Sequence, residues 1–407
     1  MPRIERQRGG LRVRIEVMVC PATEAPVAAA RMRDAWGDVP DWLWVQHSVV
    51  QPAAEVGRAF AAAFPGTALH IATSCLGAMD NGGAAIGPGG AIGALALWDP
   101  AGDFGAAAMA CDGDMRSAAR AALDTALARA GRPGEAPELI WLSASPGAEE
   151  VILDELKRRV GADTPVYGGS AADDDVSGRW AVGDGDRCHG AGLVISVLFP
   201  GAAFGHAFQS GYAPMGPEGT VTAANGRRLV EIDGRPARAV YNDWTGGAVI
   251  DGDGDAAVSI LAPSTWRPLG RPDGALGGVP FHLLLHPAEA TADGALVLFA
   301  DVAEGECVQL MGGTPESLTA RAARTVALAA ETAGLCPADI AGALVIFCGG
   351  SMLAMQATMS EVAAQVDRSL GGAPFLGGFT FGEQGPRLHD GNGHGNLMIS
   401  AIVFGRS

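Results

Sequence analysis

Basic residues are scarce in this sequence. Its 407 residues include 28 Lys and Arg against 45 Asp and Glu, which gives a formal net charge of −17. A phosphate backbone or an anionic lipid surface binds proteins mainly through Lys and Arg. We therefore expect neither nucleic acid nor membrane lipid among the partners.

Paired cysteines and long hydrophobic runs are also missing. The seven cysteines are an odd number without a C-x-x-C pair, which argues against a disulfide scaffold and a zinc ribbon. No window approaches the ~20 apolar residues of a membrane span, and the basic opening stretch lacks the apolar core of a secretory signal. A reducing cytoplasm is the expected location, with no membrane insertion.

The most informative feature that is present is an internal repeat. The phrase "TPVYGGSAADDD", which contains Gly168-Gly169, returns as "APFLGGFTFGEQGP", which contains Gly377-Gly378. Downstream, "HGAGLVIS" is answered by "HGNLMIS", and a strand followed by an amphipathic helix precedes each Gly-Gly phrase. The sequence therefore predicts an internal duplication.

Length and alternation of elements set the expected organisation. A prior of roughly 100–200 residues per domain favours two domains, and adjacent strands without intervening helices indicate an α/β (α+β) fold with mixed sheets flanked by helices. We predict a lead segment (1–35), an N-terminal half (36–238, repeat core about 67–200) and a C-terminal half (239–407, repeat core about 280–405). Residues 201–280 read as a Pro- and Gly-rich β-like connection between the repeat cores.

Three phrases resemble a known family. "GTVTAANGRRLVEIDGRPA" is similar to the passage that closes the N-terminal half of FIST-domain proteins, and "PFLGGFTFGEQGP" followed by "HGNLMISAIVF" resembles the end of their C-terminal half. The resemblance covers nearly the whole chain from about residue 40. It implies a sensor that binds a small molecule, such as an amino acid, and signals to a separate partner protein.

One departure from the family bears on the ligand. Family members often carry Cys and then Arg after the strand that "ALVIFC" matches, whereas this chain reads "CGGSMLAMQ". A guanidinium that would hold a ligand carboxylate is therefore missing. Three other classes remain open: a haem-based nitric oxide sensor, an enzyme that uses Cys348, and a protein-interaction scaffold.

The repeated glycines are the first candidate ligand site. Glycine lets a backbone or a ligand approach a strand closely, and close packing between elements is the alternative explanation. Strand alternation would place Gly378, Thr380 and Gly382 on one face, opposite Glu383. Glu383 could bind an amine, with an exposed acid at a strand end as the alternative. The predicted binding positions are Gly377, Gly378, Thr380, Gly382, Glu383, Gly168, Gly169 and Ser170.

Cys348 is a further candidate because it lies where a strand turns into a helix. Pockets collect at such turns in α/β proteins, and a helix N-terminus can lower the pKa of a thiol. A buried, inert cysteine is the commoner outcome. The sequence contains no G-x-S-x-G elbow, no H-E-x-x-H and no P-loop, which lowers the expectation of catalysis.

Haem would need an axial ligand from the protein. The possible ligands are His206, Tyr212, His189 and His394, each of which could equally be structural. No metal-ion site is expected. Asp251, Asp253 and Asp255 have the spacing of a calcium loop, but Ala256 and Ala262 stand where such a loop needs Gly and Glu, so a turn is predicted.

Overall fold

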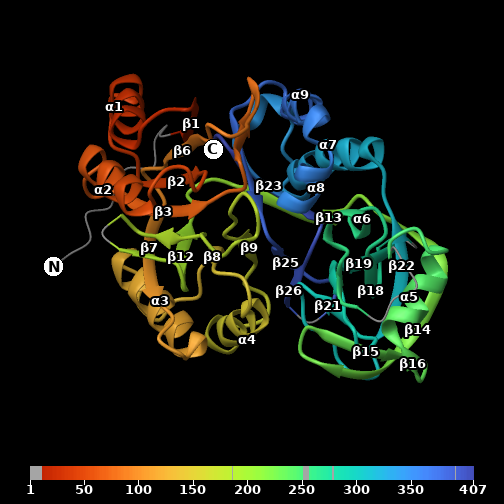
Figure 1. Cartoon of the computed structure of the whole chain (residues 1–407). Coiled ribbons are helices and arrows are strands. Elements are labelled where there is room, and N and C mark those ends of the chain that lie inside the picture. The colour runs from red at the N-terminus through yellow and green to blue at the C-terminus, as the bar shows by residue number, and fades with distance from the viewer. Residues whose placement is uncertain (1–11, 186, 251–255, 277–278, 390) are drawn as a thin grey trace.

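The computed structural model describes residues 12–185, 187–250, 256–276, 279–389 and 391–407. The described chain forms three related α/β units and a β-rich insert (Figure 1). In Figure 1 the first two units lie on the left, the insert lies on the right, and helices α7 to α9 of the third unit lie above it.

The first unit packs two helices against a mixed sheet. Helix α1 has Pro at its first turn and ends at Gly37, and the fully buried strand β2 pairs in parallel with β3. Its elements are β1 (Arg14–Pro21), α1 (Ala25–Trp36), β2 (Trp42–His47), α2 (Ala53–Ala63), β3 (Ala68–Thr73), β4 (Gly77–Asp80), β5 (Gly83–Ile86) and β6 (Ala91–Trp98).

The second unit repeats this order. Asp114 caps the first helix by accepting a hydrogen bond from the Ser117 amide at 3.2 Å, as an N-cap side chain does. Its elements are β7 (Asp103–Ala110), α3 (Met115–Arg129), β8 (Leu139–Ala144), α4 (Glu149–Val160), β9 (Val166–Ser170), β10 (Val182–Gly183), β11 (Cys188–His189) and β12 (Gly192–Phe199).

The third unit repeats the order again, with one interrupted helix. The sequence predicts one helix over residues 352–372, but the structure has α8 and α9 separated by a 3-10 turn. Thr358 Oγ1 donates to the Met355 carbonyl at 2.9 Å, and such a local bond competes with the helical pattern. The elements are β13 (Phe204–Ser210), α7 (Pro315–Thr332), β23 (Ile340–Cys348), α8 (Gly349–Ala354), α9 (Met359–Leu370), β24 (Phe375–Thr380), β25 (Glu383–Pro386), β26 (Asn392–Gly395) and β27 (Met398–Gly405), with 3-10 turns at Pro337–Asp339 and Gln356–Thr358.

The three units exchange hairpins in a cycle. Each forms a six-stranded sheet from four of its own strands and two strands of another unit, in the orders β1-β6-β2-β3-β10-β11, β7-β12-β8-β9-β25-β26 and β13-β27-β23-β24-β4-β5. The first unit's hairpin thus joins the third sheet, the second unit's joins the first, and the third unit's joins the second. The predicted repeat is confirmed, and the structure shows one more copy of the unit than the sequence phrases revealed.

Gly168 and Gly169 allow one of these exchanges. They pair with Gln384 and Glu383 of the incoming strand β25. A Cβ on Gly168, whose φ is +139°, would lie 1.9 Å from the Leu142 carbonyl oxygen, and a Cβ on Gly169 would lie 2.5 Å from Thr380 Cγ2. Close packing between units explains both glycines.

Gly377 and Gly378 serve the corresponding junction in the third sheet. A Cβ on Gly377 would lie 2.4 Å from Met79 Cγ of the incoming strand β4, and a Cβ on Gly378 would lie 2.8 Å from Gln46 Oε1. The two Gly-Gly phrases therefore recur because each receives a strand from another unit at short distance.

The insert lies between β13 and α7. Its described elements are β14 (Ala213–Asn225), β15 (Arg228–Ile232), β16 (Arg235–Pro236), α5 (Ala237–Thr245), β17 (Val258–Ser259), α6 (Leu261–Ser264), β18 (Leu269–Leu276), β19 (Val279–Leu285), β20 (Pro287–Ala290), β21 (Leu296–Leu298) and β22 (Cys307–Gly312). It joins the body through two adjacent segments, because Ala213 at its start pairs with Gly312 at its end. The predicted repeat core of about 280–405 takes in the end of this insert, whereas β13, the first strand of the third unit, precedes it.

Apolar side chains fill both sides of the sheets. One large core joins strands of all three units with α7 and α9, and separate cores lie beneath α3 and α4, beneath α1 and α2, and within the insert. Trp44 and Trp141 meet edge to face at 4.9 Å between the first two sheets, an arrangement worth about 0.5–1.5 kcal/mol beyond burial alone. The three units therefore share one interior.

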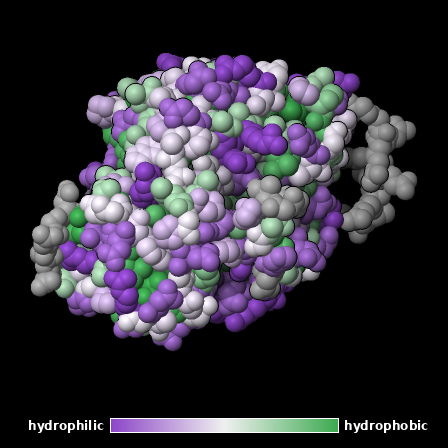
Figure 2. All heavy atoms as spheres, turned by 90° about the vertical axis from the view of Figure 1, so that its right-hand side faces the viewer, coloured by the Kyte–Doolittle hydropathy of each residue, from purple (hydrophilic) through white to green (hydrophobic). Residues whose placement is uncertain are grey.

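The surface toward the insert side is mixed in character. Figure 2 shows hydrophilic and hydrophobic residues interspersed on this face.

Residues 12–35 of the predicted lead segment belong to the first unit, with β1 paired to β6. Asp251, Asp253 and Asp255 lie outside the described residues.

Candidate functional site

A cavity of about 500 Å³ lies between the insert and the third unit. Its mouth is marked by the exposed residues Ala262 and Ala354 and by Val176, which reaches it from the second unit. Val176 has φ +58°, an uncommon conformation for a β-branched residue, and Asp173 holds the loop by accepting from the Arg179 amide at 2.8 Å. The second unit, the third unit and the insert thus all contribute residues to the cavity.

The walls of the cavity are apolar and aromatic. Leu261 and Trp266 come from the insert, Phe299 from the loop after β21, and Leu353 and Phe381 from the third unit. Large apolar side chains with few polar groups are typical of small-molecule sites. The cavity has the size and character of such a site.

Cys348 contributes to the floor. It ends β23, all nine residues of which are buried, and the chain turns there into α8. Its sulfur receives hydrogen bonds from the Gly350, Ser351 and Leu397 amides. Burial, aided by the nearby Glu383, nevertheless raises the pKa of the thiol well above its usual value. Cys348 is therefore a protonated thiol at neutral pH.

Glu383 lies directly behind Cys348 and is fully buried. It accepts hydrogen bonds from Thr380 Oγ1 at 2.8 Å and the Met398 amide at 2.9 Å, and it interacts with the Cys348 thiol. Burial raises its pKa to about 8 despite these donors. The alternative of an exposed strand-end acid is wrong.

The predicted alternation across this segment is also wrong. Strand β24 ends at Thr380, and the chain turns at Phe381 and Gly382, whose φ is +121°. The turn brings Thr380 and Glu383 together, although simple alternation would place them on opposite faces.

The insert contributes His286 to the floor of the cavity. Its Nε2 donates to the Leu261 carbonyl at 3.0 Å, and its amide donates to Asn396 Oδ1 at 3.1 Å. Burial lowers the pKa of the imidazole to about 4. A neutral ring that carries its proton on Nε2 has an acceptor at Nδ1.

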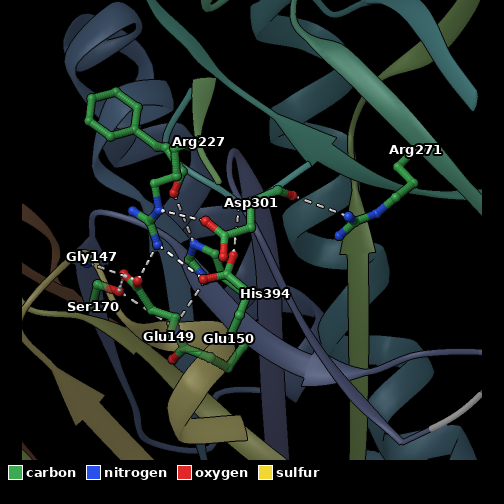
Figure 3. Close-up of polar contacts among 10 residues, drawn as sticks. Gly147, Glu149, Glu150, Ser170, Arg227, Arg271, Asp301 and His394 are labelled. Atoms are coloured by element: carbon green, nitrogen blue, oxygen red, sulfur yellow. Dashed lines mark hydrogen bonds and ion pairs between the residues drawn. The ribbon is translucent and has the colours of Figure 1, made fainter. Parts of the chain in front are cut away.

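A buried ionic network lies behind the cavity wall (Figure 3). Glu149, at the start of α4, is fully buried and accepts hydrogen bonds from the Gly147 amide at 2.9 Å, from Ser170 Oγ and from Arg227 of the insert. Arg227 also donates to Glu150 at 3.1 Å. Burial alone would raise the pKa of Glu149, but His394, Arg227 and Ser170 hold it below its usual value.

His394 connects this network to the cavity. Its Nε2 lies 3.3 Å from the carbonyl oxygen of Phe299, a wall residue, and its Nδ1 lies 3.3 Å from Gln384 Nε2. A Cβ on Gly382, which lines the cavity, would lie 2.3 Å from His394 Cε1. Displacement of Phe299 or Gly382 would therefore move His394 and change its contacts in the network.

The structure places five of the nine predicted ligand-binding residues at or directly behind the cavity lining. Cys348 and Gly382 line the cavity, Thr380 and Glu383 lie immediately behind Cys348, and Ser170 donates its amide to the Gly382 carbonyl at 2.8 Å. Gly168, Gly169, Gly377 and Gly378 lie at the junctions between units described above and are not among the described lining residues.

The predicted haem ligands do not converge. His206 Nδ1 is 3.0 Å from the Tyr167 hydroxyl, Tyr212 is 3.4 Å from Ser351 Oγ, and His189 lies in the short strand β11. Both ring nitrogens of His394 are engaged within the network. No group of three metal-ligating side chains occurs in the described part of the chain.

Sequence reasoning missed the insert's share of the site. His286, Trp266, Phe299 and Arg227 come from segments interpreted as connection or repeat strands. These residues come close together only in the folded chain.

The fold and the cavity define an α/β protein of three hairpin-exchanging units, with a cavity of about 500 Å³ beneath a β-rich insert. The FIST N domain model matches residues 45–235 and the FIST C domain model matches residues 237–386, so the chain belongs to the FIST family. FIST domains are associated with signal-transduction sensors that bind small ligands.

Solved structures show distant likeness over the whole length. A cyanuric acid hydrolase from A. caulinodans is 9% identical with a TM-score of 0.38, and a second cyanuric acid hydrolase is 8% identical with a TM-score of 0.40; each alignment covers 97% of this chain and 100% of the other. The T. maritima PurL complexed with ATP gives a TM-score of 0.21 at 9% identity, covering 97% of this chain and 71% of the other.

A comparison with curated proteins gave no significant match. Among the described helices, none has the length and apolar character needed to cross a bilayer.

Proposed function

We propose that the protein is a cytoplasmic small-molecule sensor whose ligand occupies the cavity between the insert and the third unit. The observation that carries the proposal is this cavity of about 500 Å³, lined from both sides by apolar residues and floored by a few polar groups. Sites of this kind bind small molecules.

The position of the cavity suggests how binding becomes a signal. The insert is joined to the body by two adjacent segments at Ala213 and Gly312, and Arg227 ties it to Glu149. If the insert can take two positions relative to the third unit, a ligand that binds one position more tightly shifts the equilibrium toward it. A separate partner protein would bind one of these positions of the insert and not the other.

Catalysis by Cys348 has less support. A nucleophilic cysteine needs a thiolate, and burial together with Glu383 raises the pKa of this thiol. Glu383, the carboxyl group that contacts the sulfur, has its pKa raised to about 8 by burial and is mostly protonated at neutral pH, so it does not take up the thiol proton. Haem binding needs one axial ligand beside an open space, and none of the four candidates is among the described residues that line the cavity.

Native mass spectrometry and an absorbance spectrum of the protein as purified test the proposal first. A retained small molecule supports it, and a Soret band would favour the haem alternative. A thermal-shift screen that includes amino acids and haem follows, since ligand at 100 times its Kd adds about 2.7 kcal/mol of stability.

Ala354→Trp provides the decisive variant. Ala354 is exposed at the mouth, so a large ring there should block entry without disturbing the core. Ala30→Trp, at an exposed position of α1, is the matched control. A ligand response that survives in Ala354→Trp would overturn the proposed site.

A further inference from the structure

The described lining of the cavity contains no Asp, Glu, Lys or Arg. Glu383, the nearest buried acid, is separated from the cavity by Cys348 and is satisfied by Thr380 and Met398. A free amino acid would bury an ammonium and a carboxylate here without opposite charges, which is strongly unfavourable. The ligand that suits this lining is uncharged.

Three aromatic rings form much of the wall. Trp266, Phe299 and Phe381 all line the cavity, and Phe299 and Phe381 are held by further ring contacts, with His286 at 5.9 Å and Trp180 at 6.4 Å. Fixed rings favour offset or edge contacts with another ring. A flat aromatic ligand makes the most of such walls.

The floor offers one hydrogen-bond acceptor of defined position. Because His286 Nε2 must carry the proton that it donates to the Leu261 carbonyl, Nδ1 is the acceptor of the neutral ring. No described residue donates to Nδ1. Gly350 borders this edge of the ring: a Cβ there would lie 3.6 Å from Nδ1 and 3.4 Å from Cε1. Gly350 also lines the cavity, so its missing side chain leaves room beside the acceptor.

We infer that the cavity binds a neutral aromatic molecule that donates one N–H or O–H group to His286 Nδ1. The inference rests on the proposed function and specifies its ligand class. His286 and Gly350 together determine specificity: the ring supplies the acceptor, and the glycine leaves the space through which the donor reaches it.

Three probes of similar shape test the inference by isothermal titration calorimetry. Indole is neutral and carries an N–H donor, benzothiophene lacks the donor, and L-tryptophan adds the two charges of an amino acid. We expect indole to bind roughly tenfold more tightly than benzothiophene, the value of one satisfied hydrogen bond. L-tryptophan should bind at least roughly a hundredfold more weakly than indole.

Two variants locate the effect. Gly350→Ala adds one methyl in a helical position, 3.3 Å from the side-chain end of Leu397, which must give by a few tenths of an ångström; the fold should persist while the preference for indole over benzothiophene falls to less than about threefold. Ala354→Trp should abolish the binding of all three probes.

The outcomes separate the inference from the function on which it rests. If L-tryptophan binds more tightly than indole and Ala354→Trp removes that binding, the ligand class is overturned and the sensor proposal stands. Equal binding of indole and benzothiophene would overturn the role of His286 Nδ1. If no probe gives binding that Ala354→Trp blocks, the ligand class is overturned, and native mass spectrometry then decides the sensor proposal.

Discussion

Arg227 of the insert donates a hydrogen bond to the fully buried carboxylate of Glu149 at the start of α4. The pair joins two parts of the chain that are distant in sequence, as Figure 3 shows. A buried ion pair adds little net stability, but loss of one partner leaves an uncompensated charge. The contact therefore links the insert to α4 through a buried charge that needs its partner.

Replacement of Arg227 by Met should reduce the free energy of unfolding by about 3–5 kcal/mol, because the buried carboxylate of Glu149 loses its countercharge. Urea denaturation followed by circular dichroism measures the change. In the double variant with Glu149→Gln the loss should be smaller, since no buried charge remains.

The neighbouring Arg228→Met is the matched control. Arg228 pairs with Asp293, whose side chain is 70% exposed, and exposed pairs contribute about 0–1 kcal/mol. Equal losses for the two arginine variants would show that Arg227 and Glu149 do not form a buried tie.

Glu383 should make the protein less stable as the pH rises. Its folded-state pKa of about 8 exceeds its ordinary value of 4.5, so the folded protein holds a proton that the unfolded chain has released. Stability from this group is complete below about pH 4.5 and is lost as pH rises toward 8, by up to about 1.4 kcal/mol per pH unit.

Unfolding measurements between pH 6.5 and 8 isolate this effect. Below pH 6.5 the buried His47, His70 and His286, whose pKa values are lowered to about 4, 3 and 4 by burial, make stability fall with decreasing pH instead. Glu383→Gln should flatten the profile between pH 6.5 and 8. A wild-type slope that persists in this variant would contradict the assignment.

Gly168→Ala should be severely destabilising, by at least about 3 kcal/mol, because the new Cβ meets the Leu142 carbonyl and the backbone φ is positive. Gly190→Ala is the control, since the nearest described atom to its Cβ is 3.6 Å away, and it should change stability by less than about 0.5 kcal/mol. Thermal and urea unfolding compare the two. Tolerance of Ala at residue 168 would argue that the Gly-Gly phrase serves something other than close packing.

Cys348 should react more slowly with iodoacetamide than the exposed Cys188, Cys307 and Cys336. Burial and Glu383 keep its thiol protonated, and the thiolate is the reactive form. Peptide mass spectrometry after timed labelling gives the order of modification. Labelling of Cys348 ahead of the exposed cysteines would restore the enzyme hypothesis.

Much of the local structure could be predicted from the sequence. Helix α7 begins at Thr314 and Pro315 as expected, because a capping residue and Pro at the first turn act within a few residues. Strand β23 and the hairpin β4–β5 also follow from local apolar runs and glycines. The contact between Thr380 and Glu383 depends on a turn that alternation did not predict.

The sequence by itself determined that related α/β units recur and that two corresponding strands carry Gly-Gly, because both features stand in the order of residues along the chain. Only the tertiary structure decided which unit receives which hairpin, and that His286 and Arg227 of the insert meet Cys348 and Glu149 of the body. Such contacts depend on how sheets pack across long separations, and no local propensity or spacing records that distance.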